Sequence, residues 1–154
     1  MSDFPTSARV VIIGGGAVGA SSLYHLCKAG WTDCVLLEKN ELTAGSTWHA
    51  AGNVPTFSSS WSIMNMQRYS AELYRRLGDE VDYPMNYNVT GSVRLGHSKE
   101  RLQEFQKVVG MGRYQGMDLN ILTPDEIRRV CPFVEPRALT GALHAPYAGG
   151  IDPA

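Results

Sequence analysis

Three glycines and one acidic residue near the N-terminus have the types and spacing that bind the phosphates and ribose of a dinucleotide. Gly14, Gly16 and Gly19 match the pattern G-x-G-x-x-G, and Glu38 follows them at the distance at which a second strand would end. The first glycine allows a sharp turn, the second lets the backbone approach a pyrophosphate, and the third lets a helix pack closely on a strand. A glutamate at the later position can accept hydrogen bonds from both ribose hydroxyls, whereas a 2′-phosphate favours an arginine. The four residues therefore predict a site for FAD or NAD rather than NADP.

The segments around these residues predict one complete strand–helix–strand unit. Residues 8–13 form a β-branched run that is typical of a strand buried on both faces. A helix with apolar residues at helical spacing over 20–27 follows, and Gly30 is placed to end it. Residues 34–37 predict the second strand, which Glu38 closes. Because glycines, helix, strand and acid stand in register, the signal is far more specific than the glycine pattern alone.

Composition excludes several other classes of protein. The chain has 154 residues, of which 44% are hydrophobic and 19% charged, so a folded domain is expected rather than disorder. Lys and Arg number 14 against 15 Asp and Glu, which predicts no basic surface for nucleic acid or for an anionic membrane. The longest aliphatic run, 10–13, is far shorter than the roughly 20 residues of a membrane span. The histidines and cysteines lack metal-ligand spacing; Cys27 and Cys34 are expected to be buried free thiols, typical of a reducing compartment.

The segment that follows Glu38 distinguishes FAD from NAD. A nicotinamide-binding domain usually returns to helix and strand directly after the acid, whereas residues 39–53 here read KNELTAGSTWHAAGN. FAD needs a segment that wraps the cofactor beyond the first strand–helix–strand unit, since its isoalloxazine ring lies far from the adenine. Small residues let the backbone approach a ligand closely. The composition of 39–53 therefore favours FAD.

Residues 36–39 and 42–52 resemble the FAD-dependent dimethylglycine and sarcosine dehydrogenases, which belong to the D-amino-acid-oxidase-like oxidoreductases. The motif Trp-His-Ala-Ala-Gly at 48–52 is the most discriminating part of the resemblance. The similarity continues through Gly-Ser-Val-Arg-Leu at 91–95 and Gly-Ile-Asp-Pro at 150–153. It implies an incomplete α/β fold, in which a Rossmann-like FAD-binding βαβ unit precedes the start of an α+β substrate domain.

The resemblance also implies which residues contact FAD. The expected cofactor-binding residues are Gly14, Gly16, Ala17, Val18, Gly19, Glu38, Lys39, Gly45, Ser46, Thr47, Trp48, His49, Ala50, Ala51, Gly52 and Asn53. In the dehydrogenases of this family, the histidine of the motif bonds covalently to the 8α-methyl carbon of the flavin, and His49 occupies the matching position. The alternative is that His49 only hydrogen-bonds the flavin or caps a turn, and Lys39 is equally consistent with a solvated surface lysine.

The activity that the resemblance implies is hydride transfer from the N-methyl carbon of dimethylglycine or sarcosine to FAD. The expected partners are a small methylated amine and an electron acceptor, either electron-transfer flavoprotein or oxygen; tetrahydrofolate is left open, through a domain beyond this chain. No nucleic acid, membrane or metal partner is expected, and the expected location is the cytoplasm, or the mitochondrial matrix in a eukaryote. No catalytic residue can be assigned, because the base and the carboxylate clamp are expected beyond Ala154.

Two alternative functions remain at this point. One is an NAD-dependent dehydrogenase of the same fold, in which the segment around His49 has no role. The other is a noncatalytic regulatory subunit that keeps the flavoprotein fold to bind a partner enzyme. Retention of His49 disfavours this second alternative, because a scaffold has no need of a covalent tether.

The domain organisation is expected to follow that of the family. Residues 8–58 are predicted to form the βαβ unit and the flavin-wrapping segment, residues 59–147 the start of the substrate domain, and residues 148–154 a return toward the FAD domain. Since a Rossmann-type sheet normally has five or six strands and only two are identified here, the chain is expected to be the N-terminal part of a longer flavoenzyme.

The middle of the chain predicts further helices and strands. A helix that ends at Gly78 is expected after Trp61, with Met64, Met66 and Tyr69 in the core. The other expected elements are a half-exposed strand over 88–95 with Arg94 facing solvent, helices after Ser98 and after Thr123, and a strand over 139–144.

Overall fold

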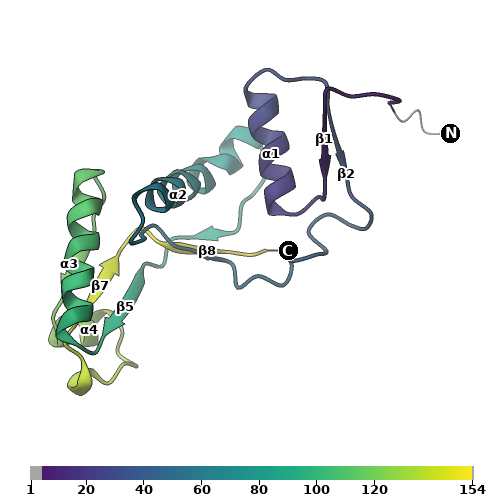
Figure 1. The fold of residues 1–154 in the computed structure, drawn as a ribbon. Helices are drawn as coiled ribbons and strands as arrows, with labels where there is room; N and C mark the ends of the chain where they lie inside the picture. The colour runs from purple at the N-terminus through teal and green to yellow at the C-terminus, as the bar shows by residue number, and fades with distance from the viewer. Residues whose placement is uncertain (1–4, 154) are drawn as a thin grey trace. The chain divides into compact units, whose positions relative to one another are not determined.

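A computed structural model describes residues 5–153 and divides the chain into two compact units (Figure 1). The first unit consists of residues 1–51 with 153–154, and the second of residues 52–152. Within the described residues, no helix is long and apolar enough to cross a membrane.

The first unit contains the predicted strand–helix–strand motif. Strand β1 (Val10–Ile13) leads into helix α1 (Ala17–Lys28), which is followed by strand β2 (Cys34–Leu37). The two strands pair in parallel, with Val10 opposite Cys34 and Ile13 opposite Leu37, and α1 lies against them (Figure 1). Gly30 has a φ of +86° just after α1 ends, which is the left-handed conformation that favours glycine at this place. The predicted fold class and the positions of all three elements are confirmed.

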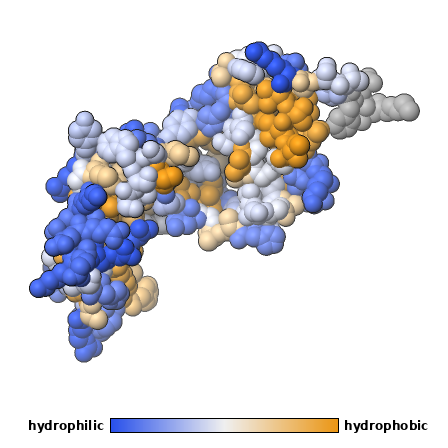
Figure 2. All heavy atoms as spheres, viewed as in Figure 1, coloured by the Kyte–Doolittle hydropathy of each residue, from blue (hydrophilic) through white to orange (hydrophobic). Residues whose placement is uncertain are grey.

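The burial expected for this sheet is only partly correct. Val11, Ile13 and Leu37 are exposed, Ile13 to 88%, and Figure 2 shows a hydrophobic surface over β1 and β2. The reason is that α1 is the one described helix of this unit and packs on the strand pair from one side. Cys27 is likewise exposed rather than buried, and Cys34 is half-buried. Gly19 is the residue of α1 that is buried.

The second unit contains two antiparallel sheets of three strands each. The first has the order β3-β8-β4, with bounds Asn53–Val54, Gly149–Ile151 and Tyr87–Asn88. The second has the order β5-β7-β6, with bounds Ser92–Gly96, Gly141–Ala145 and Asn120–Leu122. The predicted half-exposed strand is therefore split between β4 and β5, and the strand expected over 139–144 is β7.

The sequence predicts where three helices of the second unit begin: α2 (Trp61–Val81), α3 (Lys99–Tyr114) and α4 (Pro124–Val130). It does not predict the short 3₁₀ helix η1 (Pro136–Ala138). Ser98 caps α3 by accepting a hydrogen bond from the Arg101 N–H, and Thr123 with Glu126 forms a reciprocal capping box on α4. Helix α2 continues three residues past Gly78 to Val81, and its C-cap residue Asp82 has a φ of +50°.

The core of this unit lies on the two faces of the β5-β7-β6 sheet. On one face Leu143 packs in a buried cluster with Phe57, Met64, Phe105 and Val109. On the other face Ala142 packs with Ile127 and Leu139. Adjacent residues of β7 thus serve opposite faces, as the alternation of a strand requires.

Helix α2 differs in detail from the sequence prediction, whereas Arg94 agrees with it. Met64 is fully buried as expected, but Met66 is 65% exposed and Tyr69 is also exposed. The apolar stripe of α2 is wider than the face that its neighbours cover, so periodicity alone assigned too many residues to the core. Arg94 is exposed, as predicted, and its guanidinium also lies 4.7 Å from the centre of the buried Phe57 ring.

Candidate functional site

The turn between β1 and α1 has the geometry that the glycine pattern predicts. Gly14 has a φ of +104°, which a residue with a side chain rarely adopts, and its N–H extends the parallel ladder by donating to the Leu37 carbonyl at 2.7 Å. A Cβ added to Gly19 would lie 1.8 Å from the Gly14 carbonyl oxygen and 3.4 Å from the Ile12 side chain. Gly19 is therefore required for α1 to pack on the turn and on β1.

The carboxylate of Glu38 is held by backbone N–H groups at the end of β2. Gly15 N–H donates to Oε2 at 2.7 Å, and Asn40 N–H donates to Oε1 at 2.9 Å. The hydrogen bond from Gly15, followed by that from Asn40, holds the pKa of the Glu38 carboxyl below its ordinary value, because both favour the charged form. The site thus presents an ionised acceptor beside the phosphate-binding turn.

Gly15 is a functional position that the sequence pattern did not single out. A Cβ added there would lie 2.4 Å from the Leu42 side chain and 3.2 Å from Cβ of Glu38. Its carbonyl also accepts a hydrogen bond from the Thr43 N–H at 3.2 Å. The signal available in the sequence was the run of three glycines, of which the G-x-G-x-x-G pattern uses only two.

We expect the Glu38→Gln variant to reveal this ionisation through the pH dependence of stability. Because the folded pKa is depressed, the stabilisation is present above the ordinary value of 4.5 and is lost as the pH falls through the folded pKa. The difference in Tm between wild type and Glu38→Gln should therefore be steady from neutral pH down to about 5 and shrink below 4.5. Thermal unfolding across this range is the measurement, and a difference that does not change with pH would contradict the assignment.

The first turn of α1 is capped by a residue that lies 30 positions away. The N-cap residue Gly16 has no side chain to offer, and the Ala17 N–H donates instead to Thr47 Oγ1 at 2.9 Å. A Cβ on Gly16 would lie 2.8 Å from the same hydroxyl oxygen. Because Gly16 has no Cβ, the Thr47 hydroxyl can reach the N-terminus of α1.

The segment from Glu41 to Ala50 folds as a series of tight turns. Ala44 N–H donates to the Glu41 carbonyl, Trp48 N–H to the Thr43 carbonyl, and Ala50 N–H to the Thr47 carbonyl. Thr43 adopts a φ of +67°, which the sequence did not predict, since threonine is rarely left-handed. These bonds hold the expected flavin-wrapping segment in one compact conformation.

His49 is oriented by the backbone of this segment. Its Nδ1 lies 2.8 Å from the Gly45 carbonyl oxygen, which can only accept, so Nδ1 carries the proton. In the neutral ring the lone pair is then on Nε2, and the side chain is exposed. Within residues 5–153, Nε2 makes no hydrogen bond, so the ring is fixed to the turn through Nδ1 alone.

The remaining expected contact residues divide between the two units. Val18, Lys39, Ser46, Trp48, Ala50 and Ala51 lie in the first unit with exposed side chains. Gly52 and Asn53 belong to the second unit, where Asn53 begins β3 and the Gly52 carbonyl accepts a hydrogen bond from the Ile151 N–H at 2.8 Å. The structure therefore brings together the residues from Gly14 to Ala51.

The residues of the first unit fit FAD. Helix α1 has no acidic residue in its first turn, so its N–H groups and its dipole favour a phosphate. Glu38 supplies an ionised acceptor for ribose hydroxyls, and its negative charge would repel a 2′-phosphate at the same place. The described residues include no group of His, Cys, Asp and Glu that could hold a metal ion.

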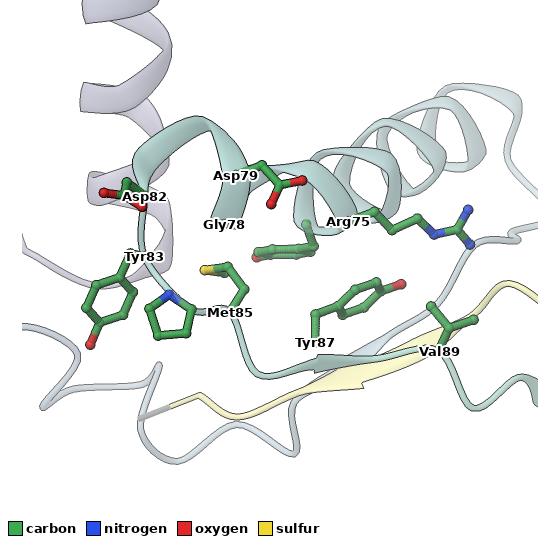
Figure 3. Close-up of a pocket in the computed structure, with 10 residues that line it drawn as sticks. Arg75, Gly78, Asp79, Asp82, Tyr83, Met85, Tyr87 and Val89 are labelled. Carbon is green, nitrogen blue, oxygen red and sulfur yellow. The ribbon is translucent and has the colours of Figure 1, made fainter.

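The second unit contains a separate cavity of about 600 Å³ beside the end of α2 (Figure 3). The Tyr74 and Tyr87 rings lie 5.8 Å apart along it, and the Tyr87 hydroxyl is buried with no hydrogen-bond partner within residues 5–153. Asp79, Asp82 and Met85 also line this cavity. None of the expected FAD contacts is among its lining residues.

A glycine turn, a helix N-terminus and an acid at the end of a parallel strand together define a dinucleotide-binding unit of the Rossmann type. The chain belongs more particularly to the FAD dependent oxidoreductase family, whose model matches residues 9–154. FAD is accordingly the cofactor class of this chain, and NAD is disfavoured.

The chain is also similar in sequence to curated proteins that are much longer. Dimethylglycine dehydrogenase of Rattus norvegicus is 40% identical over 146 residues, which cover 95% of this chain and 17% of that protein. The pyruvate dehydrogenase phosphatase regulatory subunit of Mus musculus is 37% identical, covering 92% of this chain and 16% of that protein. The chain therefore spans about a sixth of the length of these curated relatives.

The fold is also similar to that of solved flavoprotein structures. L-Proline dehydrogenase of P. horikoshii superposes with a TM-score of 0.87 at 24% identity, covering 97% of this chain and 39% of that one. At this identity the likeness supports the fold alone.

Proposed function

We propose that this chain is the N-terminal, cofactor-binding part of a flavoenzyme that oxidises an N-methylated glycine, dimethylglycine or sarcosine. The observation that carries the proposal is the orientation of His49, whose Nδ1 is occupied by the Gly45 carbonyl while Nε2 is free. This histidine lies in a segment that is hydrogen-bonded to the turn between β1 and α1. The 40% identity to a dimethylglycine dehydrogenase supports the substrate class.

The chemistry that FAD would supply when bound is acceptance of a hydride from an N-methyl carbon of the amine. The substrate becomes an iminium ion, which water converts to formaldehyde and the demethylated amine, or which tetrahydrofolate captures. An electron-transfer flavoprotein or oxygen must then take up the two electrons. The described residues would contribute to binding: the N-terminus of α1 would hold the pyrophosphate, Glu38 the ribose, and His49 the flavin.

We further propose that His49 is the covalent tether. A bond would form between Nε2 and the 8α carbon, a proton would leave that carbon, and the two electrons would pass to the flavin and then to oxygen. Residues 8–58 would form the FAD-binding and flavin-wrapping part, residues 59–147 the start of the substrate domain, and residues 148–154 the return. The three free cysteines support a reducing compartment, the cytoplasm or the mitochondrial matrix.

The experiment that tests the activity uses the protein encoded by the complete reading frame. Dimethylglycine and sarcosine are supplied with an artificial electron acceptor, and formaldehyde and acceptor reduction are measured, with glycine betaine as the control amine. The expected result is one formaldehyde for each pair of electrons transferred, and no turnover of betaine. An FAD-loaded protein that oxidises neither amine would overturn the proposal and favour a regulatory role like that of the phosphatase subunit.

A further inference from the structure

We infer that Thr47 is a positioning residue that couples the phosphate-binding turn to the orientation of His49. The inference rests on the proposed function for the covalent bond to His49, but its structural part stands on contacts within the first unit alone. Covalent attachment at His49 would then depend on the turn that binds the pyrophosphate.

The side chain and the backbone of Thr47 hold two different parts of the site. Its Oγ1 accepts the Ala17 N–H at 2.9 Å, where a helix N-terminus otherwise lacks an acceptor. Its carbonyl accepts the Ala50 N–H at 3.0 Å and so closes the turn that contains Trp48 and His49. One residue thus fixes the helix that receives the pyrophosphate and the turn that carries the histidine.

The hydroxyl of Thr47 keeps a hydrogen available after this contact is made. As an acceptor toward Ala17 it uses one lone pair, and its O–H remains free to donate. Its position at the N-terminus of α1, against the bare backbone of Gly16, is where a helix of this motif receives a phosphate oxygen. A donor at this point would hold the turn in place when the pyrophosphate binds.

The geometry of His49 depends on the same turn. Its Nδ1 contact reaches back four residues to Gly45, and the intervening Thr47 is the residue of that stretch that is bonded to α1. The Thr43 N–H donates to the Gly15 carbonyl and so connects the start of the segment to the turn between β1 and α1. Without the Thr47 hydroxyl, the segment would stay attached at Thr43 only, and His49 would sample more orientations.

The test compares Thr47→Val, which keeps the shape but removes the hydroxyl, with Thr47→Ser, which restores it. Thr32→Val is the matched control, because Thr32 is an exposed threonine in the loop between α1 and β2 and lies outside the proposed site. Each full-length apoprotein is mixed with FAD; covalent flavin is followed over time by fluorescence of the denatured band, and backbone hydrogen exchange of residues 41–51 is measured in parallel. We expect Thr47→Val to attach flavin about five-fold more slowly at saturating FAD, because the free energy of one helix-cap hydrogen bond corresponds to about this factor in rate.

Hydrogen exchange separates this inference from the proposed tether. Faster exchange over 41–51 in Thr47→Val, with wild-type exchange in Thr47→Ser and Thr32→Val, is the result expected whether or not the flavin is covalent. Wild-type exchange in Thr47→Val would overturn the inference, as would an unchanged rate of attachment. Absence of covalent flavin in the wild type would instead overturn the tether and leave the positioning role to be decided by exchange.

Discussion

Replacement of His49 by alanine should abolish covalent flavin while leaving FAD able to bind. The imidazole is the proposed nucleophile, whereas the phosphate-binding turn and Glu38 are untouched by the change. The measurement is flavin fluorescence in the protein band after acid denaturation and gel electrophoresis of the full-length protein. Wild type should show a fluorescent band, and His49→Ala should lose more than about 95% of it, because no side chain remains to form the bond.

His144, which lies on β7 in the second unit, provides the control. It is half-buried and outside the expected cofactor contacts, so His144→Ala should keep the fluorescent band. Loss of the band in His144→Ala but not in His49→Ala would place the tether elsewhere. Free flavin released from the wild type would leave FAD binding intact and reject the covalent bond.

The Gly19→Ala substitution should cause the largest loss of stability of any single methyl group added to the first unit. Its Cβ would lie 1.8 Å from the Gly14 carbonyl oxygen, and the obstacle is backbone rather than a flexible side chain. Helix α1 must therefore move away from the turn, at a cost of about 3 kcal/mol by analogy with other overpacked sites. FAD affinity should fall together with stability, since the N-terminus of α1 would leave the position that receives the phosphates.

Gly110 offers a matched control for this prediction. It lies in α3 with no atom within 4 Å of an added Cβ, so Gly110→Ala should stabilise the protein by up to about 1 kcal/mol through helix propensity. Urea unfolding and FAD titration of both variants are the measurements. Unchanged FAD affinity in Gly19→Ala would show that the helix can yield at this turn, and would count against the assigned packing role.

The local fold was largely predictable because the signals for it are local. The bounds of β2, the end of α1 near Gly30 and the caps at Ser98 and Thr123 depend on neighbouring residues, and the structure confirms each of them. Burial was predicted less well, because it depends on layers that the pattern does not specify. Ile13 and Met66 are apolar residues at regular spacing, yet both are exposed where no described neighbour covers them.

The candidate site shows the same division between local and long-range information. Gly14, Gly19 and Glu38 were predictable because a fixed spacing in sequence encodes a fixed turn in space. The contacts of Gly15 with Glu38 and of Ala17 with Thr47 join residues 23 and 30 positions apart, and no pattern encodes them. They join the end of β2 and the segment expected to wrap the flavin to the turn expected to bind the phosphates.

Anaerobic reduction of the bound flavin is the measurement that tests the central claim most directly. The full-length, FAD-loaded protein is mixed with dimethylglycine without oxygen or any acceptor, and the visible absorbance of the oxidised flavin is recorded. We predict that this absorbance is lost with dimethylglycine or sarcosine, because hydride from the N-methyl carbon then has no destination but FAD. A flavin that stays oxidised with both amines would contradict the account.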